Sequence, residues 1–143
     1  MPLPERADAP VLDIRFPRRP EQVAQARRAT HLTLTSWGLP DAAVETTVLV
    51  VSELVTNAVR HARSAPGREI ALRITRTGVH HIRVEVADAG DGLPRPRTAL
   101  PDDESYRGLA LVAALTTRNG VTPRPHGIGK TVWAEIDASG TSP

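Results

Sequence analysis

The sequence predicts an α+β domain whose helices pack on one face of a mixed or antiparallel β-sheet. The expected elements follow one another as βααββαβ, without the strict strand–helix alternation that builds a parallel sheet. The chain has 143 residues, a length typical of one domain, and 40% of them are hydrophobic. Because aromatic residues make up only 3%, the core must be built mainly from Val, Leu, Ile and Ala.

The first two elements expected are a strand and a helix. Residues 11–16 alternate apolar and polar side chains, as a half-buried strand does. The segment from about Pro20 to Trp37 has apolar residues at helical spacing, and Gly38 ends it. A strand therefore leads directly into a helix that can cover the sheet.

A second helix is expected over residues 41–62, with Asp41 as its N-cap. Its β-branched stretch at 46–51 would by itself favour a strand. Helical periodicity decides, because six small apolar residues fall within about 100° of arc, a stripe that no strand produces. The stripe, expected to face the core, consists of Val44, Val48, Val51, Val55, Ala58 and Ala62.

The remaining elements are an antiparallel hairpin, a helix and a last strand. Residues 69–76 and 81–88 alternate apolar and charged side chains around a short turn. Residues 89–106 are rich in Gly, Pro and Asp and have no period, so we expect a functional loop there. A helix over 109–115 and a strand over 131–136 complete the domain.

Composition and charge exclude several classes of protein. The 17 Arg and one Lys are nearly balanced by 8 Asp and 8 Glu, and no helix-turn-helix signature is present, so nucleic-acid binding is not indicated. The absence of cysteine excludes disulfides and thiolate zinc sites. We find neither a secretory signal nor an apolar run near the ~18 residues of a membrane span, and expect a cytoplasmic location. Residues 1–10 and 138–143 are expected to be frayed tails around a domain at 11–137.

The second helix places polar side chains on one face. Glu53, Asn57 and His61 follow at i, i+4 spacing, with Arg60 beside them. Two apolar residues share this arc, Val50 and Leu54. Taken alone, the pattern is also that of an ordinary solvent-exposed helix face.

Two glycine-containing segments could hold a ligand. The sequence DAGDG at 88–92 ends a strand with the carboxylate of Asp88, and Gly90 and Gly92 then allow a sharp turn and a close approach to a flat ligand. The sequence RGL at 107–109 opens a helix, whose free N–H groups suit a phosphate. Taken alone, the first segment is also typical of a plain turn, and the second of an ordinary helix start.

The joint order of four motifs resembles a known family. ELVTNAVRH, DAGDG, RGLALV and GKTVWAEI follow in the order found in the Bergerat-type ATP-binding fold of the GHKL superfamily. The chain resembles in particular the single-domain anti-sigma-factor serine/threonine protein kinases of bacteria, over about residues 11–137. The resemblance implies a two-layer sandwich that binds ATP and Mg²⁺. No P-loop motif is present.

The resemblance implies a role for each motif residue. Asn57 would hold Mg²⁺ on the ATP phosphates, and Glu53 would be the general base. Asp88 would accept the adenine amino hydrogen. Lys130, the only lysine, is expected at a solvent-facing strand start. The other nucleotide-binding positions carried over are Arg60, His61, Gly90, Gly92, Arg107, Gly108, Leu109 and Thr131, with Thr131 completing the adenine contact and residues 93–106 forming the ATP lid.

The resemblance implies that the protein sequesters a sigma factor and phosphorylates a serine or threonine of an antagonist protein. Tyr106 stands where relatives tend to have glycine, which leaves open a second function, a nucleotide-gated or nucleotide-free regulator that binds a partner without phosphoryl transfer. A histidine-kinase catalytic domain is a third interpretation, but it needs a separate dimerising region. Relatives are often dimers, so a homodimer is expected as well.

Overall fold

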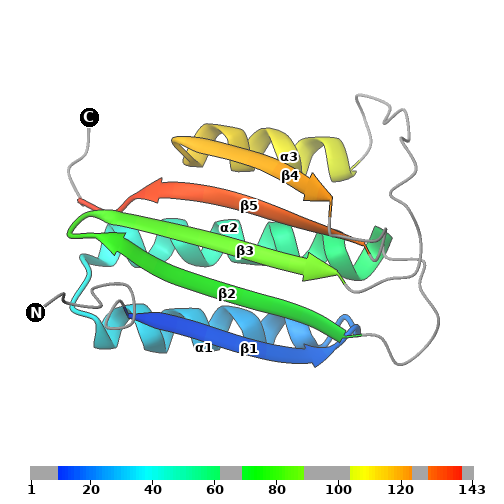
Figure 1. Ribbon diagram of the computed structural model, residues 1–143, viewed down its shortest axis with the longest axis horizontal. Coiled ribbons are helices and arrows are strands. Elements are labelled where there is room, and N and C mark those ends of the chain that lie inside the picture. The colour runs from blue at the N-terminus through cyan, green and yellow to red at the C-terminus, as the bar shows by residue number, and fades with distance from the viewer. Residues whose placement is uncertain (1–9, 62–68, 89–103, 124–128, 140–143) are drawn as a thin grey trace, which may run out of the picture.

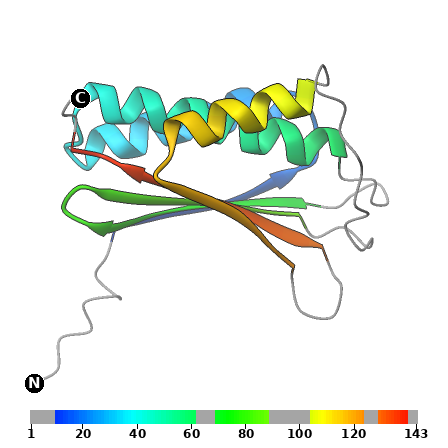
Figure 2. The same ribbon diagram turned by 90° about the horizontal axis from the view of Figure 1, so that it is seen from above.

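A computed structural model describes residues 10–61, 69–88, 104–123 and 129–139 (Figure 1). Its helices lie on one face of a five-stranded sheet with the strand order β1-β2-β3-β5-β4, and each neighbouring pair of strands is antiparallel (Figure 2). The predicted fold class is therefore confirmed, with an antiparallel sheet. The elements are β1 (Val11–Pro17), α1 (Gln22–Ser36), α2 (Asp41–His61), β2 (Glu69–Gly78), β3 (His81–Asp88), α3 (Glu104–Leu115), β4 (Arg118–Pro123) and β5 (Lys130–Asp137).

The structure adds β4, a strand that the sequence pattern did not predict. This strand forms an edge of the sheet and most of its residues are exposed, so it lacks the alternation of a half-buried strand. Gly120 and Pro123 also argue against a strand when the sequence is considered alone. Gly120 is required by its neighbour on β5, because an added Cβ would lie 2.8 Å from Cζ2 of Trp133.

Helix α3 begins earlier than predicted. It starts at Glu104 instead of residue 109, so Gly108 lies inside the helix and not at its opening. A glycine in a helix interior costs about 1 kcal/mol relative to alanine, which the rest of a helix can tolerate. Tyr106 is therefore in helical backbone, which any L-residue can adopt, and needs no positive φ there.

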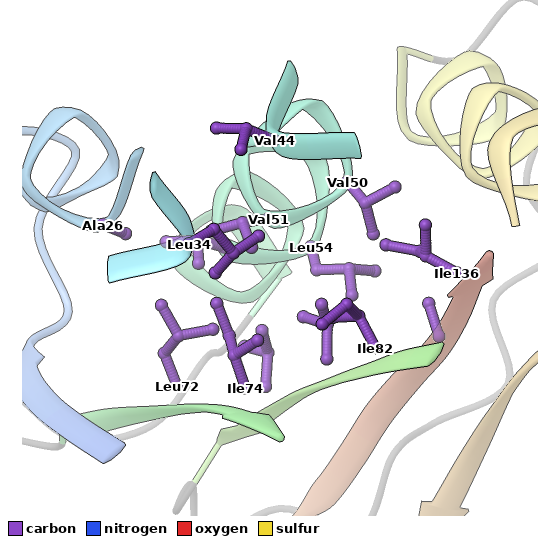
Figure 3. Close-up of a cluster of buried hydrophobic side chains, with 14 of the residues drawn as sticks. Ala26, Leu34, Val44, Val50, Val51, Leu54, Leu72, Ile74, Ile82 and Ile136 are labelled. Atoms are coloured by element: carbon purple, nitrogen blue, oxygen red, sulfur yellow. The ribbon is translucent and has the colours of Figure 1, made fainter. Parts of the chain in front are cut away.

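The core face of α2 is broader than predicted. Val44, Val51 and Val55 are buried as expected, whereas Val48 and Ala58 are half-buried. Two residues that were expected on the polar arc, Val50 and Leu54, are fully buried and point toward Ile136 and Ile82 of the sheet (Figure 3). The reason is that α2 lies between α1 and α3 as well as over the sheet, so three sides of this helix are covered.

Helix α2 also corrects the expectation about membrane spans. Residues 41–60 are long and apolar enough to cross a membrane by length and composition, the one such helix in the described chain. Glu45 and Glu53 interrupt the apolar sequence of this helix, so a search for uninterrupted apolar runs does not find it. In the fold this helix contributes buried side chains to the core, as the central helix of a domain does.

The face of the sheet opposite the helices carries polar and charged side chains. Arg83 on β3 donates to Glu135 on β5 at 2.8 Å, and its guanidinium lies 4.4 Å from the ring centroid of Trp133. Arg118 on β4 lies 5.7 Å from the same ring. Just after β5, Ala138 is buried and its N–H donates to the His80 carbonyl oxygen at 2.7 Å.

Candidate functional site

Four elements that carry predicted site residues end or begin at the same end of the molecule. Figures 1 and 2 show the last turn of α2, the first turn of α3, the end of β3 and the start of β5 together there. The contacts of α2 with α3, β3 and β5 agree with this arrangement. The fold therefore gathers motifs that are far apart in the sequence.

Asp88 is the one charged side chain that is buried in the part of the chain the structure describes, with 9% of its surface exposed. It ends β3 and pairs with Ile70 on β2 and Lys130 on β5. The other buried polar residues, Thr30 and Thr47, donate to carbonyl oxygens of their own helices at 2.7 and 2.8 Å. Burial of a carboxylate is costly unless it accepts hydrogen bonds. Asp88 therefore lies at the boundary of the core, at the end of β3 where the sequence predicts a ligand-binding segment.

The register separates Thr131 from Asp88. Thr131 pairs with Ala87, whereas Lys130 pairs with Asp88. Successive side chains of a strand point to opposite faces, and the buried Ala134 places the even-numbered positions of β5 on the face that the helices cover. Lys130 therefore lies on the same face as Asp88, and Thr131 lies on the opposite face.

Sequence reasoning missed the position of Lys130. This residue was expected to face solvent at the start of a strand, but it is half-buried on the face that the helices cover. The signal was available in the sequence, because Val132, Ala134 and Ile136 alternate as the apolar face of β5. Extending that alternation back by one step puts Lys130 on the same face.

Helix α2 brings Glu53 and Asn57 to the edge of its core face. Both residues are half-buried, they lie one turn apart, and Arg60 in the next turn is exposed. Their neighbours Val50 and Leu54 are fully buried. The two polar side chains therefore border apolar packing instead of lying in the middle of a solvated face.

The remaining predicted positions lie outside the described side chains. Two glycines and most of the expected lid fall in residues that are not described, namely Gly90, Gly92 and the range 93–103. Three residues lie on α3 and one ends α2, and their side chains are outside the description as well: Arg107, Gly108, Leu109 and His61. Their assignment to the site stays a prediction.

The side-chain oxygen atoms on α2 suit a cation that is bound partly by the protein and partly by a ligand. The described residues contain no group of three or more His, Cys, Asp or Glu side chains that could hold a metal ion. Mg²⁺ commonly takes one or two protein oxygens and completes its shell with substrate phosphates and water. The amide oxygen of Asn57 suits that mode, in which the protein provides few ligands.

Comparisons with known proteins agree with the fold. Residues 16–136 match the sequence profile of the histidine kinase-like ATPase domain. The histidine kinase domain of the blue-light activated histidine kinase from Erythrobacter litoralis EL346 has 31% sequence identity and a TM-score of 0.53, covering 68% of this chain and 45% of that one. A longer structure of the blue-light activated histidine kinase from the same organism has 30% identity and a TM-score of 0.55, covering 71% of this chain and 32% of that one.

This chain therefore spans less than half of either solved protein. No curated protein sequence matches it. The family profile, however, runs from the end of β1 almost to the end of β5 and includes α2 and Asp88. The chain therefore belongs to the histidine kinase-like ATPase domain family of the GHKL superfamily.

Proposed function

We propose that this protein is a Mg-ATP-dependent serine/threonine protein kinase that regulates a sigma factor. In this account it binds the sigma factor, and it phosphorylates a serine or threonine of an antagonist protein. The observation that carries the proposal is that Glu53 and Asn57 lie one turn apart on α2, and the last turn of this helix lies at the end of the sheet where β3 ends with the buried Asp88. Both proposed partners act inside the cell, which supports a cytoplasmic location.

The proposed nucleotide contacts follow from the donors and acceptors at this end. The carboxylate of Asp88 accepts a hydrogen bond from the exocyclic amino group of adenine, a donor that the corresponding position of guanine lacks. The amide oxygen of Asn57 would hold Mg²⁺, which would supply positive charge to neutralise the phosphates. The exposed guanidinium of Arg60 is suited to a phosphate because it offers several fixed N–H donors.

Glu53 is proposed to accept the proton of the substrate hydroxyl. The hydroxyl oxygen then forms a bond to the γ-phosphorus, and the bond from that phosphorus to the leaving ADP oxygen breaks. Phosphoryl transfer depends mainly on positioning and charge neutralisation, so a carboxylate one turn from the cation ligand is well placed for the proton. Glu53 and Asn57 thus act as a pair.

Transfer to a protein hydroxyl is tested by incubating the chain and radiolabelled Mg-ATP with candidate anti-sigma-factor antagonists. We expect acid-stable phosphoserine or phosphothreonine on one of them, and no label with Glu53→Ala. An acid-labile phosphohistidine would favour the histidine-kinase interpretation. No labelled protein, together with intact nucleotide binding, would contradict the kinase assignment.

Tyr106 supports a second candidate function. The sequence has a tyrosine, in the first turn of α3, where relatives tend to carry a glycine. Such a chain could still bind a sigma factor, with nucleotide acting only as a switch or not at all. The two functions differ in one measurement, because only the kinase releases ADP at a rate that depends on the antagonist protein.

A further inference from the structure

We propose that Lys130 determines the base specificity of the nucleotide site, because its ammonium group donates a hydrogen bond to N1 of adenine. This contact lies beside the adenine amino group, which is assigned to Asp88 in the proposed function. The inference rests on that function, since it requires an adenine nucleotide where β3 ends. It adds a second residue that reads the base, and the pairing of β3, β4 and β5 supports it.

The sheet places Lys130 beside Asp88. The two residues are directly opposite each other in the pairing of β3 with β5, and both lie on the face that the helices cover. Cβ atoms of directly opposed residues are about 5 Å apart. At that separation a short carboxylate and a long, flexible lysine side chain can contact neighbouring atoms of the same ligand.

Gly129 marks the point where the chain enters β5. This glycine is buried and has a φ of 110°, a backbone conformation that residues with a side chain rarely adopt. Lys130 follows it as the first residue of the strand. A shift of the strand by one residue would move every side chain to the other face of the sheet. The position of Lys130 opposite Asp88 is therefore tied to a turn that favours glycine.

The ammonium group of Lys130 has no ion pair or hydrogen bond with a protein group in the part of the chain that the structure describes. On the β4 side its opposed residue is Pro123, whose side chain has no hydrogen-bonding atom. Lys130 is nevertheless half-buried. Removing a polar group from water is costly unless a partner replaces the water. A ligand that brings an acceptor to this position would supply that partner.

The Watson–Crick edge of adenine has a donor and an acceptor on neighbouring atoms. Its amino group donates and its N1 accepts, and proteins read bases through such edges. An ionised carboxylate only accepts hydrogen bonds, whereas an ammonium group only donates them. Guanine has the reverse pattern, because its O6 accepts and its N1–H donates. Asp88 and Lys130 together therefore match adenine at two positions and oppose guanine at both.

A contact with a phosphate is the alternative role for this lysine. In the proposed function the phosphates lie near the end of α2, where Asn57 and Arg60 are located. The register places Lys130 beside the residue that contacts the base instead. The two roles have different consequences, because only a contact with the base depends on the nitrogen atom at position 1 of the purine.

Calorimetric titration of the full chain with ATP and with 1-deaza-ATP, in which a C–H group replaces N1, tests this contact. We expect the wild type to bind ATP about three- to tenfold more tightly, because the analogue loses one hydrogen bond. Lys130→Met keeps a long apolar side chain without the donor, and it should bind both nucleotides with equal affinity. Arg118→Met removes a cation from the opposite face of the sheet and should keep the wild-type preference.

The comparison of the two nucleotides separates the possible outcomes. Equal binding of both by the wild type, or an unchanged preference in Lys130→Met, would overturn the inference. So would a loss of affinity in Lys130→Met by the same factor for both nucleotides, which indicates a phosphate contact when the thermal midpoint without nucleotide is unchanged.

Failure of the proposed function gives a different result. A chain that prefers ATP over 1-deaza-ATP but phosphorylates no antagonist protein would contradict the kinase assignment and leave the contact of Lys130 with N1 intact. A chain that binds ATP without this preference would overturn only the role of Lys130. A wild type that binds neither nucleotide would overturn both.

Discussion

Lys130 lies directly opposite Asp88 in the antiparallel pairing of β5 with β3, on the face of the sheet that the helices cover. Directly opposed residues of neighbouring strands have Cβ atoms about 5 Å apart. Lys130, the only lysine of the chain, is therefore the β5 neighbour of Asp88, which is the one buried carboxylate among the described residues. Because the two residues share this face, a substitution at Lys130 directly tests the surroundings of Asp88.

Removal of this cation should weaken nucleotide binding. We expect Lys130→Ala to lower ATP affinity about three- to tenfold, because the carboxylate loses its charged neighbour. Thr131→Ala is the matched control, since Thr131 lies on the opposite face, and it should leave the affinity unchanged. Calorimetric titration with ATP checks both variants. A large loss in Thr131→Ala with none in Lys130→Ala would show that the register assignment of the site is wrong.

Substitution of Asp88 should affect the base contact. Asp88→Asn keeps the shape of the side chain but replaces one acceptor oxygen with a donor NH₂ group. Loss of a hydrogen bond to a charged acceptor costs about 1.5–3 kcal/mol, so ADP and ATP affinity should fall about 10- to 100-fold. The thermal midpoint of each variant without nucleotide controls for folding. Equal affinity of the wild type for GTP and ATP would argue against adenine recognition by Asp88.

Substitutions of Glu53 and of Asn57 should cause different defects. Glu53→Gln should bind Mg-ATP normally and transfer little or no phosphate, because it removes a proton acceptor and keeps the side-chain volume. Asn57→Ala should lose the part of the ATP affinity that depends on Mg²⁺. Both variants are measured by titration with and without Mg²⁺ and by product formation. Normal phosphoryl transfer by Glu53→Gln would reject its role as the general base.

The edge strand β4 provides a stability prediction that is independent of function. Gly120→Ala should destabilise the fold by about 1–3 kcal/mol, because the new Cβ would lie 2.8 Å from Cζ2 of Trp133 and the ring must move. The guanidinium groups of Arg83 and Arg118 lie 4.4 and 5.7 Å from the centroid of that ring, so its movement would also disturb these contacts. Gly78→Ala is the matched control, since its Cβ would lie 3.7 Å from Cβ of His81, an ordinary contact. Urea unfolding of both variants measures the difference, and equal midpoints would contradict this packing.

Periodicity in the sequence predicted the elements with one clearly buried face. The β2–β3 hairpin and the helix α2 appear where their patterns placed them, even though part of α2 is β-branched. The sequence could not reveal β4, because an exposed edge strand needs no alternation. It also could not reveal that Val50 is buried, because this depends on how neighbouring elements cover α2.

The candidate site was predictable as a set of motifs but not as an arrangement of side chains. The order of the motifs identified the ends of α2 and β3, and the fold brings those ends together. The order of the motifs did not determine that Lys130, and not Thr131, shares a face of the sheet with Asp88. That distinction depends on the pairing register, which a shift of one residue would invert.

Calorimetric titration with ATP, with and without Mg²⁺, tests the central claim most directly when the wild type is compared with Asn57→Ala and Asp88→Asn. The account predicts micromolar binding by the wild type, strengthened by Mg²⁺, with loss of the Mg²⁺ effect in the first variant and of most affinity in the second. A wild type that binds no ATP, or variants that both bind like the wild type, would contradict a nucleotide site at this end of the sheet.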